Sequence, residues 1–205
     1  MTAQTPLKLG VLVSGTGSNL QAILDAIAAG TLNACVRVVI SNRANVLALD
    51  RARAAGVSAL TIPHRDFATR EAFDQALVFA LREAEVNWVV LAGFMRVISP
   101  VFLNAFPGRI INIHPALLPA FPGVDAAKQA FDYGVKITGC TVHFVDSGVD
   151  SGKIIAQRAV PVEAGDDLPK LAARIHGAEH ELFVSVLRDI AAGHVSACSN
   201  NTSEA

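Results

Sequence analysis

Residues 8–20, KLGVLVSGTGSNL, decide the fold. The first half of this stretch is a short apolar run typical of a buried strand, and the second half is a glycine-rich turn that opens an amphipathic helix. Further short apolar runs alternate with segments of helical period up to about residue 113. This alternation predicts βαβ units on a mainly parallel sheet.

The pattern predicts strands at 8–13, 36–40, 59–62, 88–91 and 109–113, and helices at 18–29, 46–55, 69–84 and 100–104. Thr69 suits an N-cap, and Pro100 suits a first helical turn. Beyond a proline-rich loop at 115–123 we expect a helix at 126–133, strands at 136–144 and 154–160, and a final helix at 168–192. The short connection between the last two strands indicates antiparallel pairing. The predicted fold class is therefore α/β: a Rossmann-like open, mostly parallel sheet with helices on both faces and mixed pairing in its C-terminal part.

Composition bounds the function. The chain has 205 residues, 52% of them apolar and 17% charged, so we expect one folded domain at 1–195 and a polar tail at 196–205. The net charge of −1, with both signs interspersed, excludes the basic surface of a nucleic-acid or membrane binder. Three cysteines without CxxC spacing support neither a disulfide framework nor a thiolate metal site. No apolar run suits a signal peptide or a membrane span, so we expect a cytoplasmic location.

The glycine-rich turn at 14–20 predicts an anion site. Free amides at a helix N-terminus, approached through glycines, favour a phosphate. Leu20 stands where a dinucleotide fingerprint needs its third glycine, and residues 41–43 lack the acidic residue that would bind a ribose. No GKS or GKT follows, which excludes a Walker-type site. A phosphomonoester site remains, and the alternative is a tight turn that binds nothing.

A second candidate segment is 92–98, AGFMRVI, at the end of the fourth predicted strand. Ligands of open α/β sheets lie at the carboxyl ends of strands, so this segment reaches the same edge as the glycine-rich turn. Met95, Val97 and Ile98 suit the wall of a pocket for a flat heteroaromatic ring. Taken alone, the segment also fits an ordinary apolar β–α turn.

Asn112 and His114 lie two residues apart at the end of an apolar strand that Pro115 stops, so both side chains leave one face. Asp150, in a glycine-flanked segment, is expected to fold back beside them. An amide donor, a proton-transfer group and a carboxylate that favours the charged imidazole suit acyl transfer. Because no Ser or Cys stands in a nucleophile elbow, direct transfer is favoured over a covalent intermediate.

The segment His176-Gly177-Ala178-Glu179-His180 matches the H-x-x-E-H pattern of a zinc peptidase. So short a pattern arises often by chance, Gly177 weakens a helix and no clear third ligand is present, so we expect no metal. We expect the Glu179 carboxylate to hold a substrate amine or hydroxyl instead of a zinc ion. We interpret His64, His143 and His194 as structural or surface residues.

The motifs SGTGSNLQAI, SNRA, LAGFMR, INIHPALLP, FPG, GCTVHFV, VDSGKII and HGAEH follow one another between residues 8 and 193. In this order they resemble the glycinamide ribonucleotide formyltransferase family, the folate-dependent enzymes of purine synthesis. The resemblance implies transfer of the formyl group of 10-formyltetrahydrofolate to the amine of 5-phosphoribosylglycinamide. Related formyltransferases carry an additional C-terminal β-barrel or N-terminal regulatory domain, and neither fits in 205 residues.

The resemblance also implies the site residues. Asn112, His114 and Asp150 are the expected catalytic residues; the expected substrate-binding residues are Gly17, Ser18, Asn19, His176, Gly177, Ala178 and Glu179; and the expected folate-binding residues are Arg70, Met95, Arg96, Val97, Ile98, Asn112, Asp146, Ser147, Gly148, Val149 and Asp150. The family's pattern suggests a cis Leu118–Pro119 bond. Asp125 stands where that pattern usually has histidine, and we expect its carboxylate to weaken phosphate binding.

The chain is expected to act on the two small molecules as a monomer or homodimer, without metal, nucleic acid or membrane.

Two alternative functions stay open from the residues alone. Hydrolysis of the same folate is the nearest alternative, although water needs no phosphate anchor. A folate or sugar-phosphate binding protein without catalysis is the other, although intact Asn112, His114 and Asp150 argue against it.

Overall fold

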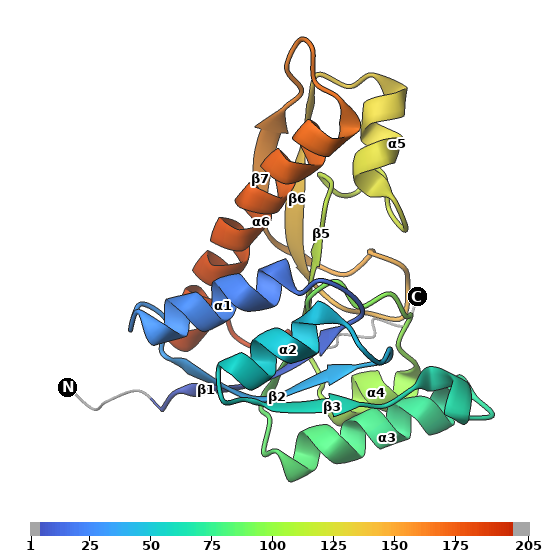
Figure 1. Ribbon diagram of the computed structural model, residues 1–205, viewed down its shortest axis with the longest axis vertical. Helices are drawn as coiled ribbons and strands as arrows, with labels where there is room; N and C mark the ends of the chain where they lie inside the picture. The colour runs from blue at the N-terminus through green and yellow to red at the C-terminus, as the bar shows by residue number, and fades with distance from the viewer. Residues whose placement is uncertain (1–4, 199–205) are drawn as a thin grey trace, which may run out of the picture.

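The computed structural model describes residues 5–198. A seven-stranded sheet in the order β3-β2-β1-β4-β5-β6-β7 runs through them (Figure 1). Its strands are β1 (Leu7–Val13), β2 (Ala34–Ser41), β3 (Ser58–Thr61), β4 (Trp88–Leu91), β5 (Ile110–His114), β6 (Ile137–Phe144) and β7 (Ile154–Pro161). The pairs among β1 to β5 are parallel, whereas β6 is antiparallel to β5 and β7 to β6. The predicted mixed sheet is confirmed.

The helices are α1 (Ser18–Ala28), α2 (Leu47–Ala54), α3 (Arg70–Glu83), α4 (Pro100–Ala105), α5 (Ala126–Tyr133) and α6 (Leu168–Ala191). Each predicted helix is present, and no end differs from the prediction by more than one residue. The hydroxyl of Thr69 accepts a 3.1 Å hydrogen bond from the amide of Ala72, so the predicted N-cap is confirmed. Pro100 lies in the first turn of α4, as predicted. The short 3-10 helix η1 (His64–Asp66) was not predicted.

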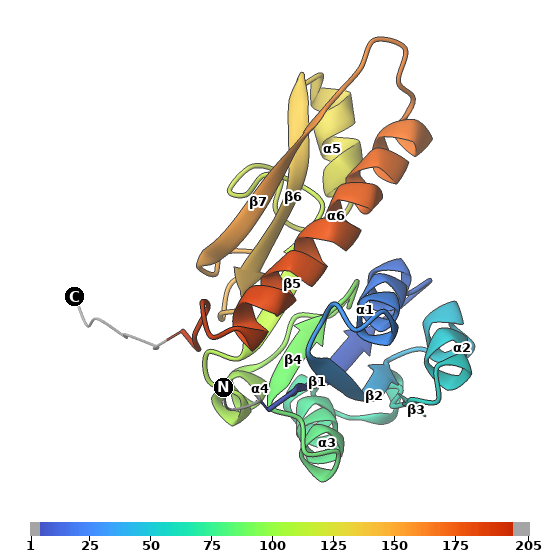
Figure 2. The same ribbon diagram turned by 90° about the vertical axis from the view of Figure 1, so that its left-hand side faces the viewer.

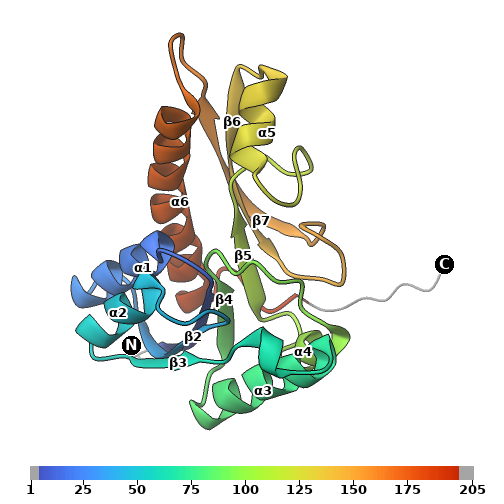
Figure 3. The same cartoon turned by 45° about the vertical axis from the view of Figure 1, so that its right-hand side comes forward.

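Helices cover both faces of the sheet (Figure 2), and an apolar core lies on each face. Helices α1, α2 and α6 cover one face, where Ile23, Leu49 and Phe183 are fully or almost fully buried. Helices α3 and α4 cover the other face with Phe73 and Phe102. Each such side chain contributes about 1.5–3 kcal/mol through burial, so the two cores hold the strand ends in place. Helix α6 continues along β6 and β7 (Figure 3).

The strand order reverses at β1, because the chain leaves β3 at one edge and returns as β4 on the other side of β1. In open α/β sheets, ligands bind at the carboxyl ends of strands beside such a reversal. Here the turns after β1 and β4 are tied together. The amide of Ser14 donates to the carbonyl of Gly93 at 3.1 Å, and the amide of Met95 donates to the Ser14 hydroxyl at 2.9 Å.

Three smaller expectations also meet the structure. The Leu118–Pro119 peptide bond is cis, as the resemblance implied. Within residues 5–198 no helix has the length and apolar character needed to cross a membrane. Most of the predicted polar tail, residues 199–205, lies outside the described residues.

Candidate active site

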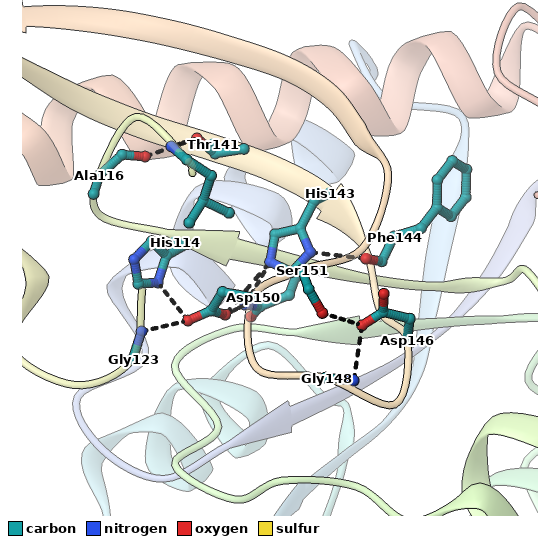
Figure 4. Close-up of polar contacts among 12 residues, drawn as sticks. His114, Ala116, Gly123, Thr141, His143, Phe144, Asp146, Gly148, Asp150 and Ser151 are labelled. Carbon is teal, nitrogen blue, oxygen red and sulfur yellow. Dashed lines mark hydrogen bonds and ion pairs between the residues drawn. The ribbon is translucent and has the colours of Figure 1, made fainter. Parts of the chain in front are cut away.

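The three predicted catalytic side chains meet at the end of β5, and Figure 4 shows two of them, His114 and Asp150. Asp150 reaches them from the loop between β6 and β7. Its Oδ2 lies 3.2 Å from Nδ1 of His114, and its Oδ1 accepts a hydrogen bond from Nδ2 of Asn112 at 3.3 Å. The amide of Gly123 donates to Oδ2 at 2.8 Å. One carboxylate therefore joins the strand end to the loop that follows it.

These contacts determine the charges of His114 and Asp150. Burial raises the pKa of Asp150, but its hydrogen bonds, among them the one from the amide of Gly123, and the charge of the His114 imidazole outweigh burial, so the pKa lies below its usual range. Nε2 of His114 lies 2.8 Å from the carbonyl oxygen of Phe121. Both ring nitrogens thus face acceptors, and only an imidazolium donates from both. His114 is 4% exposed, so the ion pair is screened little by solvent.

The loops that complete this cluster hold unusual backbone angles. Phe121, Asp125 and Asp150 have φ of 54°, 56° and 52°, in the left-handed region that non-glycine residues rarely adopt. Such angles cost on the order of 1–3 kcal/mol each and gather at functional sites. Here they turn the Phe121 carbonyl and the Asp150 carboxylate toward His114.

A cavity of about 270 Å³ opens beside this cluster. Met95, Val97 and Ile98 contribute to its wall, as expected for a heteroaromatic ring. Of the predicted folate-binding residues, those that line the cavity are Met95, Arg96, Val97, Ile98, Asn112, Asp146, Gly148, Val149 and Asp150. Arg70 and Ser147 do not line it. Arg70 begins α3, and its Nε lies 3.7 Å from a carboxylate oxygen of Glu71.

A second cavity, of about 600 Å³, adjoins the first. The residues that line both cavities are Met95, Pro115, Val124 and Asp125. Arg43 and His176 line the second cavity alone. The two cavities therefore meet beside the strand end that carries His114, which allows two ligands to approach one another there.

The predicted phosphate turn begins α1 close to this second cavity. Gly17 is the N-cap of α1 with φ 73°, and no side chain caps the helix amides. Asn19 donates from Nδ2 to Oε2 of Glu179 at 3.1 Å, and Nδ1 of His176 lies 2.9 Å from the same oxygen. The buried carboxylate of Glu179 thus links the turn to α6. Gly17, Ser18 and Asn19 do not themselves line the second cavity, nor do Gly177, Ala178 and Glu179.

His176 is positively charged more readily than a free histidine. Its hydrogen bond to Glu179 raises its pKa, although partial burial opposes the shift. Between residues 5 and 198 no group of three His, Cys, Asp or Glu side chains is placed to hold a metal ion. The H-x-x-E-H pattern instead pairs His176 with Glu179, while burial lowers the pKa of His180.

Most of the chain matches one known protein family. The family described as formyl transferase matches residues 7–187. The chain belongs to the formyl transferase family. This formyl transferase is similar to phosphoribosylglycinamide formyltransferase of Escherichia coli (strain K12), with 41% identity over 194 residues that cover 95% of the chain and 92% of that protein. The solved structure of glycinamide ribonucleotide transformylase 1 from Symbiobacterium toebii superposes with a TM-score of 0.92 at 49% identity, covering 95% and 92% of the two chains.

Some relatives of this formyl transferase are much longer. The trifunctional purine biosynthetic protein adenosine-3 of Drosophila melanogaster is 51% identical over 189 residues. The match covers 91% of the present chain and 14% of that protein. The chain thus spans about a seventh of the length of this relative.

The structure places His143, which the sequence led us to interpret as structural or surface, in the interior beside this cluster. His143 lies on β6 directly opposite Asn112 on β5 and is 2% exposed. Its Nε2 lies 3.1 Å from Nδ2 of Asn112 and 3.6 Å from Oδ1 of Asp150. The sequence shows only that a single histidine interrupts the apolar run of residues 139–145. It does not show which residue of the neighbouring strand lies opposite that histidine.

Proposed function

We propose that this formyl transferase moves the formyl group of 10-formyltetrahydrofolate to the amine of 5-phosphoribosylglycinamide, in de novo purine biosynthesis. The observation that carries the proposal is the His114–Asp150 pair at the meeting point of two cavities. A hydrolase needs one organic ligand, whereas a transferase needs two. The names of the Escherichia coli relative and of the solved structure support phosphoribosylglycinamide as the acceptor of the formyl group.

The residues of the first cavity fit a formyl folate. Apolar side chains from the segment 95–98 form one wall, and the loop 146–150 brings polar groups to the other. The second cavity fits a sugar phosphate, because Arg43 and His176, whose pKa is raised by Glu179, line it and the uncapped amides of α1 begin nearby.

The proposed reaction is direct transfer. The neutral amine attacks the formyl carbon, a C–N bond forms, and the bond from the formyl carbon to folate N10 breaks. In between, the formyl oxygen carries negative charge, which an N–H of Asn112 and the His114 imidazolium stabilise. The amine loses one proton and N10 gains one, and His114 assists that movement. Asp150 orients His114 and keeps it charged, as the 3.2 Å contact supports.

We further propose that residues 1–195 act as one formyl transferase domain in the cytoplasm, followed by the polar tail at 196–205. The protein works as a monomer or a homodimer, with the two small molecules as its partners and 10-formyltetrahydrofolate as co-substrate. Neither a metal, a nucleic acid nor a membrane takes part. The near-neutral charge and the side-chain chemistry of the two cavities support this assignment.

A steady-state assay tests the function. The purified protein is mixed with a 10-formyl folate, with and without 5-phosphoribosylglycinamide, and the deformylated folate is followed. The expected result is product formation that depends on the ribonucleotide. Equal loss of formyl folate without the ribonucleotide would establish a hydrolase, and binding of both ligands without product would establish a binding protein.

A further inference from the structure

The imidazole of His143 makes two contacts that fix its hydrogen-bonding direction. Nδ1 lies 2.7 Å from the carbonyl oxygen of Phe144, and Nε2 lies 3.1 Å from Nδ2 of Asn112 (Figure 4 draws the first). A carbonyl oxygen only accepts hydrogen bonds, so Nδ1 carries a proton. The nearest polar neighbour of Nε2 is an amide N–H group, which only donates. Nε2 is therefore an unprotonated acceptor, and His143 is neutral.

The opposite assignment is disfavoured at two points. A hydrogen bond from a protonated Nε2 to Oδ1 of Asp150 would have to span 3.6 Å, which is longer than a normal hydrogen bond. It would also place a second buried cation beside the His114 imidazolium, at a side chain that is 2% exposed. Nδ2 of Asn112 lies 3.3 Å from the Asp150 carboxylate. If the Asn112 amide were rotated, its carbonyl oxygen would take the place of Nδ2 at about that distance. Two electron-rich oxygens repel one another at that distance.

The two contacts of Asn112 are made by the nitrogen of its amide. His143 Nε2 lies 3.1 Å and Asp150 Oδ1 lies 3.3 Å from Nδ2, and the two acceptors are 3.6 Å apart. They therefore lie in different directions from Nδ2, and each of the two N–H groups of the amide has one acceptor. The N–H group that faces Asp150 makes the longer contact, so it is the one available to a ligand in the cavity that Asn112 and Asp150 line.

We propose that His143 is a positioning residue that accepts one N–H of Asn112, so that the other N–H, whose contact with Asp150 is longer, is presented to the formyl oxygen. This inference rests on the proposed formyl transfer. His143 does not touch the substrates in this scheme, and it acts through the amide of Asn112. Its place opposite Asn112 in the β5–β6 register supplies the close approach.

The variants His143→Leu and His143→Gln test this role. Loss of an oxyanion donor typically costs about 100- to 1,000-fold in kcat, so loss of a residue that only positions the donor is expected to cost about 10- to 100-fold. His143→Leu should lower kcat by that factor and leave KM for both substrates nearly unchanged. His143→Gln should recover part of the loss, because its side-chain carbonyl is able to accept from Asn112. Wild-type turnover in His143→Leu would overturn the proposal.

A matched control and a double-mutant cycle separate positioning from folding. Thr138 lies on the same strand, 2% exposed, and its hydroxyl has no partner among the described residues. Thr138→Val should therefore keep wild-type kcat. In an Asn112→Ala background, adding His143→Leu should lower kcat little further, because the two residues act as one unit. Additive losses would mean that His143 does not act through Asn112.

The tautomer provides a readout independent of activity. In the free wild-type protein, ¹⁵N NMR of the imidazoles at neutral pH should show His143 with a proton on Nδ1 and none on Nε2. A proton on Nε2 would overturn the proposal even if the enzyme is active. Conversely, wild-type protein that does not formylate the ribonucleotide would refute the proposed function, while the expected tautomer would still support the anchoring of Asn112.

Discussion

The two halves of the sheet offer different chemistry to a ligand. In the parallel half, the turn after β1 presents backbone amides at the start of α1, and residues 14–19 contain no charged side chain. In the half where pairing becomes antiparallel, β5 and β6 bring together two buried imidazoles and a carboxylate. The first half is suited to binding an anion, and the second to moving charge and protons.

The fold therefore separates ligand binding from catalysis. Backbone amides keep the same charge at every working pH and depend only on the path of the chain. Buried titratable side chains respond to each neighbour, as the lowered pKa of Asp150 illustrates. Changes in the parallel half should therefore alter substrate affinity, and changes in the antiparallel half should alter turnover.

The largest effect is expected for His114→Ala. This variant removes the imidazolium that faces Asp150 and the formyl oxygen in the proposed reaction. One oxyanion donor is typically worth about 3–4 kcal/mol, so kcat should fall at least hundreds-fold, with a smaller change in KM. Steady-state kinetics with both substrates provide the measurement. Near-normal turnover would show that the antiparallel half does not carry the chemistry.

The next largest effect is expected for Gly17→Ala in the parallel half. A Cβ at this residue would lie 2.6 Å from Cβ of Ala48, and φ is 73°. Alanine in the left-handed region costs about 1–2 kcal/mol, so kcat/KM for the ribonucleotide should fall about tenfold or more. KM for the folate should stay constant.

Gly15→Ala is the matched control, because nothing lies within 4 Å of a Cβ there. Kinetics should separate the two variants clearly. Equal effects of Gly15→Ala and Gly17→Ala would mean that the turn's conformation does not set affinity.

The parallel half was predictable because its signals are local. The apolar run, the glycine turn and the helix that follows are contiguous in the sequence, and together they predicted β1, the turn and α1. Thr69 and Pro100 marked helix starts for equally local reasons. For the same reason, the side chains of Asn112 and His114 were expected to share a strand end.

The antiparallel half was less predictable because its contacts depend on register and on distant loops. Nothing in the strands themselves states that residue 143 lies opposite residue 112, and a shift by one residue would turn His143 to the other face. The carbonyl of Phe121 reaches His114 only through a left-handed backbone angle in a loop. The contact between Asn19 and Glu179 joins residues 160 positions apart.

A smaller effect is expected for Asp125→Asn, where the two halves share a cavity wall. The carboxylate lines the same cavity as Arg43 and His176. Removing an exposed charge interaction typically changes binding by about 0.2–1 kcal/mol, so KM for the ribonucleotide should fall about 1.4- to fivefold. Asp132→Asn near the C-terminal end of α5, the helix that Asp125 precedes, should leave KM unchanged, because the Asp132 carboxylate pairs with Lys128. A higher KM in Asp125→Asn would mean that the carboxylate binds the substrate instead of repelling it.

The smallest effect concerns the pH dependence of stability at the junction of the two halves. Glu179 raises the pKa of His176, so the charged form is favoured in the folded protein. The resulting stabilisation is fully present below the unfolded pKa, about 6.5, and is lost as pH rises through the raised folded value. The free energy of unfolding of wild type minus that of His176→Gln should therefore be largest at pH 5.5–6 and shrink toward pH 8.5.

His180, one turn further along α6, provides the control of opposite sign. Burial lowers the pKa of His180, although Glu179 partly opposes the shift, so its neutral form is favoured on folding. The contribution of neutral His180 to the free energy of unfolding is therefore present above the unfolded pKa and is lost as pH falls through the lowered folded pKa. Denaturant unfolding across this pH range should give opposite slopes for His176→Gln and His180→Gln relative to wild type. Equal slopes would show that Glu179 does not distinguish the two histidines, and that the link between the α1 turn and α6 carries no charge dependence.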